Sequence, residues 1–202
     1  MDKVKDSFIL DQSKKTSNID SIIQGERYRF TVLTERLIRL EYNANSKFTD
    51  NLTASIRNRN FVKPEFNIID SSTTLEIKTK YFHIVYEKEA PLVGPKSNPS
   101  MYFYAKINNT DEVWYPNKRD TENIKGNYRS LNDNQNGETL FSRSKYAVVD
   151  ESLSPIITEN GYFTFTDNKT DIYLFVYNND FSLALQDYLA LTGKASLIPK
   201  YA

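Results

Sequence analysis

The chain lacks cysteine and has a single histidine, His83, among its 202 residues. Without cysteine there is no disulfide framework, no thiolate nucleophile and no cysteine-based zinc site. One imidazole without a second ligand nearby is also weak support for a metal site or for histidine-based acid/base catalysis. Because His83 lies between Phe82 and Ile84 in a strand pattern, we interpret it as structural and expect no bound metal.

Glycine is also scarce, with six residues that occur singly. A phosphate-binding loop needs glycines at fixed spacing, so that backbone amides can surround the phosphate. The scattered glycines therefore disfavour nucleotide binding, and we expect no cofactor.

Long apolar runs and an excess of one charge are absent too. The longest apolar run, 172–177, has six residues, whereas about 20 are needed to cross a bilayer. Near the N-terminus only Phe8, Ile9 and Leu10 form an apolar core, shorter than the roughly 7 to 15 residues of a secretory signal. Lys+Arg and Asp+Glu both number 26, so no net charge attracts nucleic acid or anionic lipid. We expect a cytoplasmic protein with no nucleic-acid or membrane partner.

A basic stretch at 57–63 mixes Arg57, Arg59 and Lys63 with Phe61, as single-strand nucleic-acid binders do. The chain has no second basic patch and no positive net charge. We therefore interpret this stretch as the solvated face of a strand at 56–61.

The chain does contain repeated alternation of apolar and polar residues, the pattern of half-buried β-strands. Two hairpins are predicted, over 28–42 with a turn at 34–35 and over 75–86 with a turn near 80. Single strands are predicted at 66–70, 101–107 and 113–115. Residues 90–100 contain three prolines and are predicted to be a loop.

The C-terminal third predicts one more hairpin and then a helix. Strands at 162–166 and 172–177 flank a turn at 167–170, which Asp167 and Asp171 are expected to support. The run 172–177 is apolar on both faces, so this strand is expected to be covered on both sides. A helix is predicted next, with Asp180 as N-cap and Gly193 at its end. Its apolar residues follow helical spacing and are Phe181, Ala184, Leu185, Tyr188 and Leu191. These elements predict an all-β fold, an antiparallel β-sandwich with one C-terminal α-helix.

A long polar loop at 123–152 interrupts the regular pattern and ends in the apolar run 146–149. Loops of more than about 12 to 15 residues are usually functional or disordered. Paired carboxylates for glycoside chemistry must face one another. The adjacent Asp150 and Glu151 would point to opposite faces of an extended chain, so we do not expect them to form such a pair.

Four stretches resemble the N-terminal domain of glycoside hydrolase family 31, the α-glucosidase and α-xylosidase family. The first hairpin reads ERYRFTVLTERLIRLEY, and the loop contains NIKGNYRSLND, similar to N-L-G-G-T-x-R-x-L-D. The following LFSRSKYAVVDES is similar to L-L-S-R-D-G-W-x-x-x-D-D-S. The segment DFSLALQDYLALTGKASLIPKYA is similar to the one that leads into that family's (β/α)8 barrel. The resemblance extends in order from about residue 22 to residue 202.

This resemblance implies a galactose-mutarotase-like sandwich that docks on a catalytic barrel and extends a loop to the sugar pocket. It implies no catalytic residue in this chain, because the family's nucleophile and acid/base lie on the barrel. Candidate pocket-wall residues are Asp120, Tyr128, Arg129, Asn132, Asp133 and Arg143. The chain departs from the family pattern at Asn132, where the family has aspartate, so Asp133 or Asp120 is expected to supply that carboxylate. A second departure replaces D-G-W by residues 144–146.

Two interpretations of Arg129 and Arg143 remain open, bracing of the loop through aspartates or carbonyls and direct sugar contact. The expected division of the chain is a leader at 1–24, the sandwich at 25–178, and a helix and linker at 179–202 toward a barrel. Expected partners are α-linked glucosides or oligosaccharides, the barrel, and a second copy pairing through the barrel-docking face.

Two alternative functions remain. A free-standing carbohydrate-binding module would stack sugars on exposed tyrosines, for which the candidates are Tyr102, Tyr104, Tyr115 and Tyr128. A sugar mutarotase is the other alternative, but it would need more than one histidine for acid/base chemistry.

Overall fold

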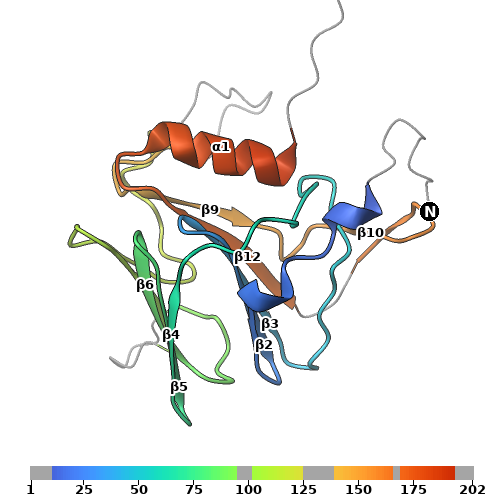
Figure 1. Ribbon diagram of the computed structural model, residues 1–202, viewed down its shortest axis with the longest axis horizontal. Helices are drawn as coiled ribbons and strands as arrows, with labels where there is room; N and C mark the ends of the chain where they lie inside the picture. The colour runs from blue at the N-terminus through green and yellow to red at the C-terminus, as the bar shows by residue number, and fades with distance from the viewer. Residues whose placement is uncertain (1–10, 95–101, 125–138, 166–168, 194–202) are drawn as a thin grey trace, which may run out of the picture.

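The computed structural model describes residues 11–94, 102–124, 139–165 and 169–193. This part of the chain forms two five-stranded antiparallel sheets, ordered β1-β2-β3-β12-β9 and β4-β5-β6-β7-β8. The all-β sandwich with one helix near the C-terminus is therefore confirmed (Figure 1).

The strands of the first sheet are β1 Ile22–Gln24, β2 Tyr28–Thr34, β3 Leu37–Asn43, β12 Lys169–Val176 and β9 Tyr146–Asp150. Those of the second sheet are β4 Asn67–Asp70, β5 Thr74–Lys78, β6 Phe82–Glu87, β7 Phe103–Ile107 and β8 Val113–Trp114. The remaining elements are the pair β10 Ile156–Ile157 and β11 Phe163–Thr164, the 3-10 turns η2 Gln12–Lys14 and η3 Ile19–Ser21, and the helix α1 Phe181–Thr192.

The first two predicted hairpins are present. β2 and β3 pair antiparallel with Phe30 opposite Leu40, and β5 and β6 pair with Ile77 opposite Ile84. Alternation places these four side chains on one face of each sheet, where all four are fully buried between the sheets. The first sheet begins at β1, within the segment 1–24 that the sequence assigned to a leader, and β1 pairs with β2.

Two predictions were wrong. Residues 56–61 form no strand, and the described strands on either side of 166–168 do not pair as the third hairpin. β11 pairs with β10, whereas β12 lies between β3 and β9 in the first sheet. A strand that is apolar on both faces is best buried at the centre of a sheet, with a neighbour along each edge.

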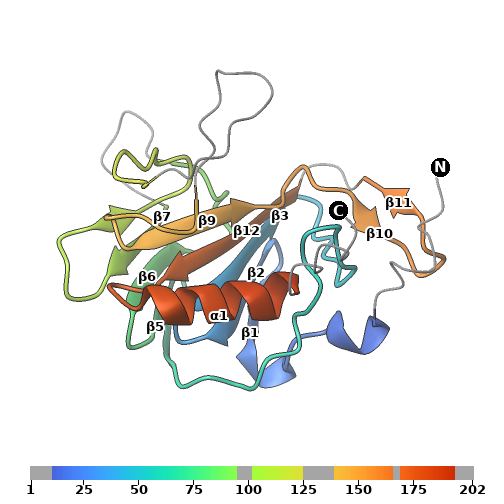
Figure 2. The same cartoon turned by 90° about the horizontal axis from the view of Figure 1, so that it is seen from above.

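β12 is covered on both faces, as its sequence predicted. Ile172, Leu174 and Val176 face the second sheet and belong to the core between the sheets. Tyr173 and Phe175 point to the other face and belong to a second apolar cluster, which includes residues of α1. The molecule therefore has three layers, and Figure 2 shows α1 crossing the strands of the first sheet.

α1 begins and ends where the sequence predicted, and Asp180 is its N-cap residue. The Asp180 carboxylate makes no capping hydrogen bond and instead accepts one from the Tyr81 hydroxyl at 2.9 Å. Gly193 has φ of 85°, a left-handed conformation that glycine adopts at little cost. No helix in the described residues is long and apolar enough to span a membrane.

Candidate functional site

The two stems of the predicted loop meet at the first sheet. Asn123 and Ser142 form an antiparallel bridge. Ile124 N–H donates to the Phe141 carbonyl at 3.0 Å, and Arg143 N–H donates to the Glu122 carbonyl at 3.0 Å. These contacts make the base of the loop a short ladder in which the two stems hold each other in register.

Asp120 is the polar centre of this base and is only 7% exposed. Its Oδ1 accepts from the Ser144 hydroxyl at 2.9 Å and from Glu122 N–H at 3.1 Å. Its Oδ2 accepts from the Asn123 amide at 3.3 Å. One carboxylate thus joins both stems, and a pocket of about 180 Å³ lies beside it, lined in part by Trp114 and Tyr146.

Tyr177 attaches the loop base to the sheet and to α1. Its hydroxyl accepts from Ser142 N–H at 2.7 Å, and its ring lies 5.3 Å from the ring of Phe181. Burial raises the pKa of Tyr177 to about 12, although its hydrogen bond to the Ser142 backbone opposes the shift. The loop base is therefore supported by a neutral, buried phenol rather than by solvent-exposed contacts.

Lys145 is one of the residues at which the chain departs from the D-G-W pattern. It stands where that pattern has glycine and has φ of 65°, in the left-handed region that costs most residues free energy. The backbone here keeps the conformation that favours glycine, although the residue is lysine.

The structure places two of the six predicted pocket-wall residues. Asp120 lies at the loop base, whereas Arg143 is exposed and contributes its backbone N–H there. Tyr128, Arg129, Asn132 and Asp133 lie outside the described residues. Tyr102, Tyr104 and Tyr115 are half-buried rather than fully exposed.

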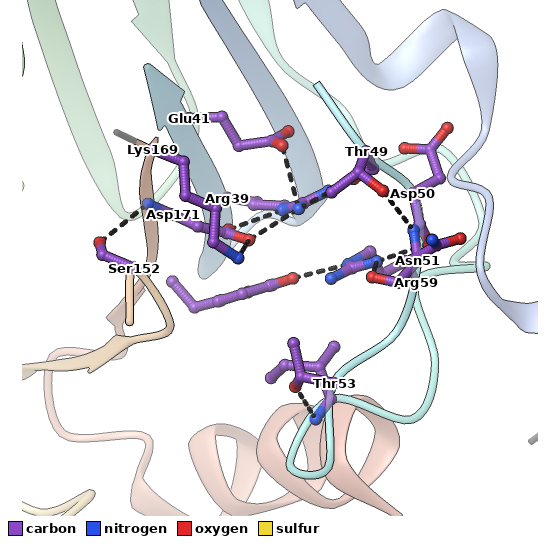
Figure 3. A network of polar contacts seen from close by, with 12 residues as sticks. Arg39, Glu41, Thr49, Asp50, Asn51, Thr53, Arg59, Ser152, Lys169 and Asp171 are labelled. Atoms are coloured by element: carbon purple, nitrogen blue, oxygen red, sulfur yellow. Dashed lines mark hydrogen bonds and ion pairs between the residues drawn. The ribbon is translucent and has the colours of Figure 1, made fainter. Parts of the chain in front are cut away.

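A buried network of charges lies on the face of the first sheet that points away from the second sheet, beside the second apolar cluster. The sequence did not predict this network (Figure 3). Glu41 and Asp171 lie directly opposite each other on β3 and β12, both less than 5% exposed. Two like charges at such a position repel. Arg39 lies between them, because its Nη2 is 2.8 Å from Asp171 Oδ2 and 3.0 Å from Glu41 Oε1.

The pKa values of these groups follow from burial and from Arg39. Burial raises the pKa of Glu41, and Arg39 opposes the shift without reversing it. Burial acts in the same direction on Asp171, but the charge and hydrogen bonds of Arg39 outweigh it and hold the pKa of Asp171 below its usual value. Burial also lowers the pKa of Lys169, whose Nζ lies 3.9 Å from Asp171 Oδ2.

Arginines of the network hold an irregular segment against the sheet. Arg29 and Arg39 both donate to the Thr49 carbonyl. Arg59 is 1% exposed, donates to the Tyr173 hydroxyl at 2.6 Å and binds two backbone carbonyls of the same segment. The interpretation of 57–63 as a solvated strand face was therefore wrong for Arg59.

Asp171 also differs from its predicted role, because it pairs with Arg39 rather than supporting a turn. A signal for the network was present in the first hairpin, where Arg29 and Glu41 fall opposite each other once the turn is placed. The apolar face of that hairpin alone predicts a half-buried strand pair and gives no sign of the charged face.

His83 contacts a carboxylate on the neighbouring strand of the second sheet. It lies on β6, and its Nε2 is 2.8 Å from Glu76 Oε2 on β5. Among the residues that the structure describes, no group of three or more His, Cys, Asp or Glu side chains could hold a metal ion.

Raising the pH from 10 to about 12 is expected to destabilise the protein through Tyr173. Burial raises the pKa of Tyr173 to about 12, compared with about 10 in an unfolded chain. A pKa raised by folding contributes stability that is complete below about pH 10 and is lost as the pH rises through about 12. Two pKa units correspond to about 2.7 kcal/mol.

Urea unfolding across this pH range measures the loss, with Tyr173→Phe as the matched variant. The variant is expected to lose less stability than the wild type over the same range, since one titrating phenol is gone. Equal losses in the two proteins would contradict the assignment.

The fold is similar to that of a GH31 dextranase from Flavobacterium johnsoniae, solved in complex with glucose. The identity is 14%, the similarity covers 88% of this chain and 27% of that chain, and the TM-score is 0.51. A mutant of the same dextranase in complex with isomaltotriose gives the same identity and coverage with a TM-score of 0.48. No protein-family model and no curated protein match the chain. At this identity the likeness concerns the fold, and the chain spans about a quarter of the dextranase.

Proposed function

We propose that the chain is the N-terminal β-sandwich domain of a retaining α-glycosidase related to family 31, an enzyme of the α-glucosidase kind. In this role it supplies a wall of the substrate pocket and a docking surface, and it carries no catalytic group. The loop base is the main support for this proposal, since the two stems meet at Asn123 and Ser142 and are joined by Asp120.

The chemistry of Asp120 agrees with a positioning role. Its two carboxylate oxygens accept three hydrogen bonds from the loop stems, and it is buried. A general acid must instead reach the glycosidic oxygen, and a nucleophile must reach the anomeric carbon. Asp120 therefore acts on the sugar pocket through the shape of the loop.

A docking surface for a neighbouring catalytic domain is offered by α1. Its outward side carries Phe181 and Leu185, which are 37% and 41% exposed. Exposed apolar side chains of this kind are typical of interfaces between domains.

Activity assays test the proposal on two proteins. One is the purified 202-residue chain, and the other is the native protein that contains it. The native protein is expected to hydrolyse p-nitrophenyl α-glucoside or isomaltose, and the chain alone is expected to hydrolyse neither. Turnover by the chain, free of host enzyme, would refute the wall-only role. Absence of any α-glycoside turnover by the native protein would refute the enzyme class.

Replacing Asp120 with alanine in the native protein tests the positioning role. Misplacement of a pocket group by about 1 Å can reduce the rate as much as 100-fold, so kcat/KM is expected to fall by up to that factor. Asp111→Ala, at an exposed position, is the matched control and should leave kcat/KM unchanged. Equal kcat/KM for Asp120→Ala and the wild type would contradict the role of the loop base.

A further inference from the structure

A second pocket, of about 290 Å³, lies at the end of the first sheet where β3 ends and β12 begins. It is lined by residues of β3, of β12 and of the segment 45–49, among them Glu41, Asn43, Asn45, Lys47, Phe48 and Lys169. Small-molecule sites usually measure roughly 300 to 1,000 Å³. The pocket is therefore large enough for one small ring and too small for a chain of several rings.

Glu41 lies at this pocket as a fixed hydrogen-bond acceptor. Arg29 donates to its Oε2 at 2.7 Å and to its Oε1 at 2.9 Å, and Arg39 Nη2 lies 3.0 Å from Oε1. A carboxylate has about four acceptor positions, so the two hydrogen bonds from Arg29 leave positions open on both oxygens, while Arg39 adds an ion pair at Oε1. The two guanidinium groups hold the carboxylate in place before any ligand arrives.

Asn43 and Phe48 add a donor and a flat apolar surface. Asn43 is 4% exposed, and its Oδ1 accepts from Asn45 N–H at 2.8 Å, so its amide N–H group is the part that can donate to a ligand. The Arg29 guanidinium lies 5.2 Å from the centre of the Phe48 ring. This contact fixes the ring from one side, and an aromatic ring is a stacking surface for the C–H face of a sugar.

The charges around the pocket favour a neutral ligand. Glu41 is a carboxylate, whereas the lining also includes two lysines, the exposed Lys47 and Lys169, whose ammonium group is buried near Asp171. An anion would meet the carboxylate, and a cation would meet the two lysines and the arginines behind Glu41. A neutral ligand with several hydroxyl groups avoids both repulsions and satisfies both donors and acceptors.

The wall of the pocket is preorganised by the buried network. Arg29 and Arg39 both donate to the Thr49 carbonyl, next to Phe48 in the chain. The segment that carries Phe48 is thus attached to the same two arginines that hold Glu41. Binding therefore requires little reordering of the segment, which preserves affinity.

We propose that this pocket binds one neutral monosaccharide ring, with its C–H face on Phe48 and its hydroxyl groups bonded to Glu41 and Asn43. The site is formed by the ends of β3 and β12, and it shares no lining residue with the pocket beside Asp120. Binding here is independent of hydrolysis by the native protein.

Two-dimensional amide NMR of the 202-residue chain, titrated with methyl α-glucoside, tests the site. Saturable shifts are expected at residues 42–49 and 169–170, with a Kd of about 1 mM, as for a small ligand with few contacts. Glucuronate and glucosamine are the charged probes, and each should bind at least about tenfold more weakly, a factor that corresponds to 1.4 kcal/mol. No saturable shift with methyl α-glucoside, or equally tight binding of either charged probe, would overturn the proposal.

Phe48→Ala should weaken binding by about tenfold or more, and Phe48→Leu should weaken it similarly while keeping apolar bulk against Arg29. Phe165→Ala is the matched control, because Phe165 is 72% exposed and does not line the pocket. Unchanged affinity in a folded Phe48→Leu protein would refute the stacking surface. Failure of the hydrolysis assays alone would leave this binding result intact.

Discussion

Replacing Arg39 with methionine is expected to lower the free energy of unfolding by about 3 to 5 kcal/mol, as when one partner of a buried ion pair is removed. Arg39 is 2% exposed and bonds to both carboxylates, Glu41 and Asp171. Without the positive charge of Arg39, the repulsion between the two buried carboxylates is less well compensated. Urea denaturation measures the change.

Lys106→Met is the matched control, because Lys106 is exposed on β7. Surface substitutions usually change stability by no more than about 0.5 kcal/mol. An equal effect of Lys106→Met and Arg39→Met would contradict a buried ion pair at Arg39.

A double-mutant cycle can isolate the repulsion that Arg39 relieves. Asp171→Asn removes one of the two opposed charges, so it should cost less in the Arg39→Met background than in the wild type. Equal costs in the two backgrounds would mean that Arg39 and Asp171 do not interact energetically.

Replacing Leu191 with alanine is expected to destabilise the protein by about 2 to 5 kcal/mol, the usual cost of such a truncation in a core. Leu191 is fully buried on α1 and belongs to the second apolar cluster, with Leu37 and Phe175 of the first sheet. Thermal or urea unfolding gives the difference.

The same helix provides the control. Leu185→Ala makes the same chemical change at a position that is 41% exposed, so its effect should be far smaller. If the two variants were equally stable, α1 would not be packed on the sheet as the structure describes.

The packing of α1 matters for the loop base, because the two share residues. Tyr177 precedes α1, accepts from Ser142 N–H and stacks near Phe181. Arg36, in the turn of the first hairpin, binds Asp187 of α1 through two hydrogen bonds of 2.7 and 3.1 Å. The helix therefore forms part of the support of the loop.

Much of the local structure could be predicted from the sequence, and its limits are visible at particular residues. Alternation identified the strands of both early hairpins because a strand shows its buried face every second residue. The same alternation could not identify the partner of β12, since any strand with a matching face could pair with it. It also overlooked the charged face of the first hairpin, where Arg39 is buried rather than solvated.

In the candidate sites, too, some residues could be named from the sequence and others only from the structure. Asp120 became a candidate only through the family resemblance, and the contacts that place it at the loop base come from residues as far away in sequence as Ser144. Glu41 and Phe48 were not predicted as site residues. They become neighbours of a pocket only when β3, β12 and the 45–49 segment come together.

The sequence by itself determined the fold class, most strands, the helix α1 and the absence of cysteine chemistry. Each of these depends on composition or on neighbours a few residues apart. Only the tertiary structure decided the place of β12 between β3 and β9, the burial of Arg39 beside Asp171 and the contact of Arg59 with Tyr173. Those partners are 132 and 114 residues apart, and a local pattern contains no information about which distant charge or strand will complete it.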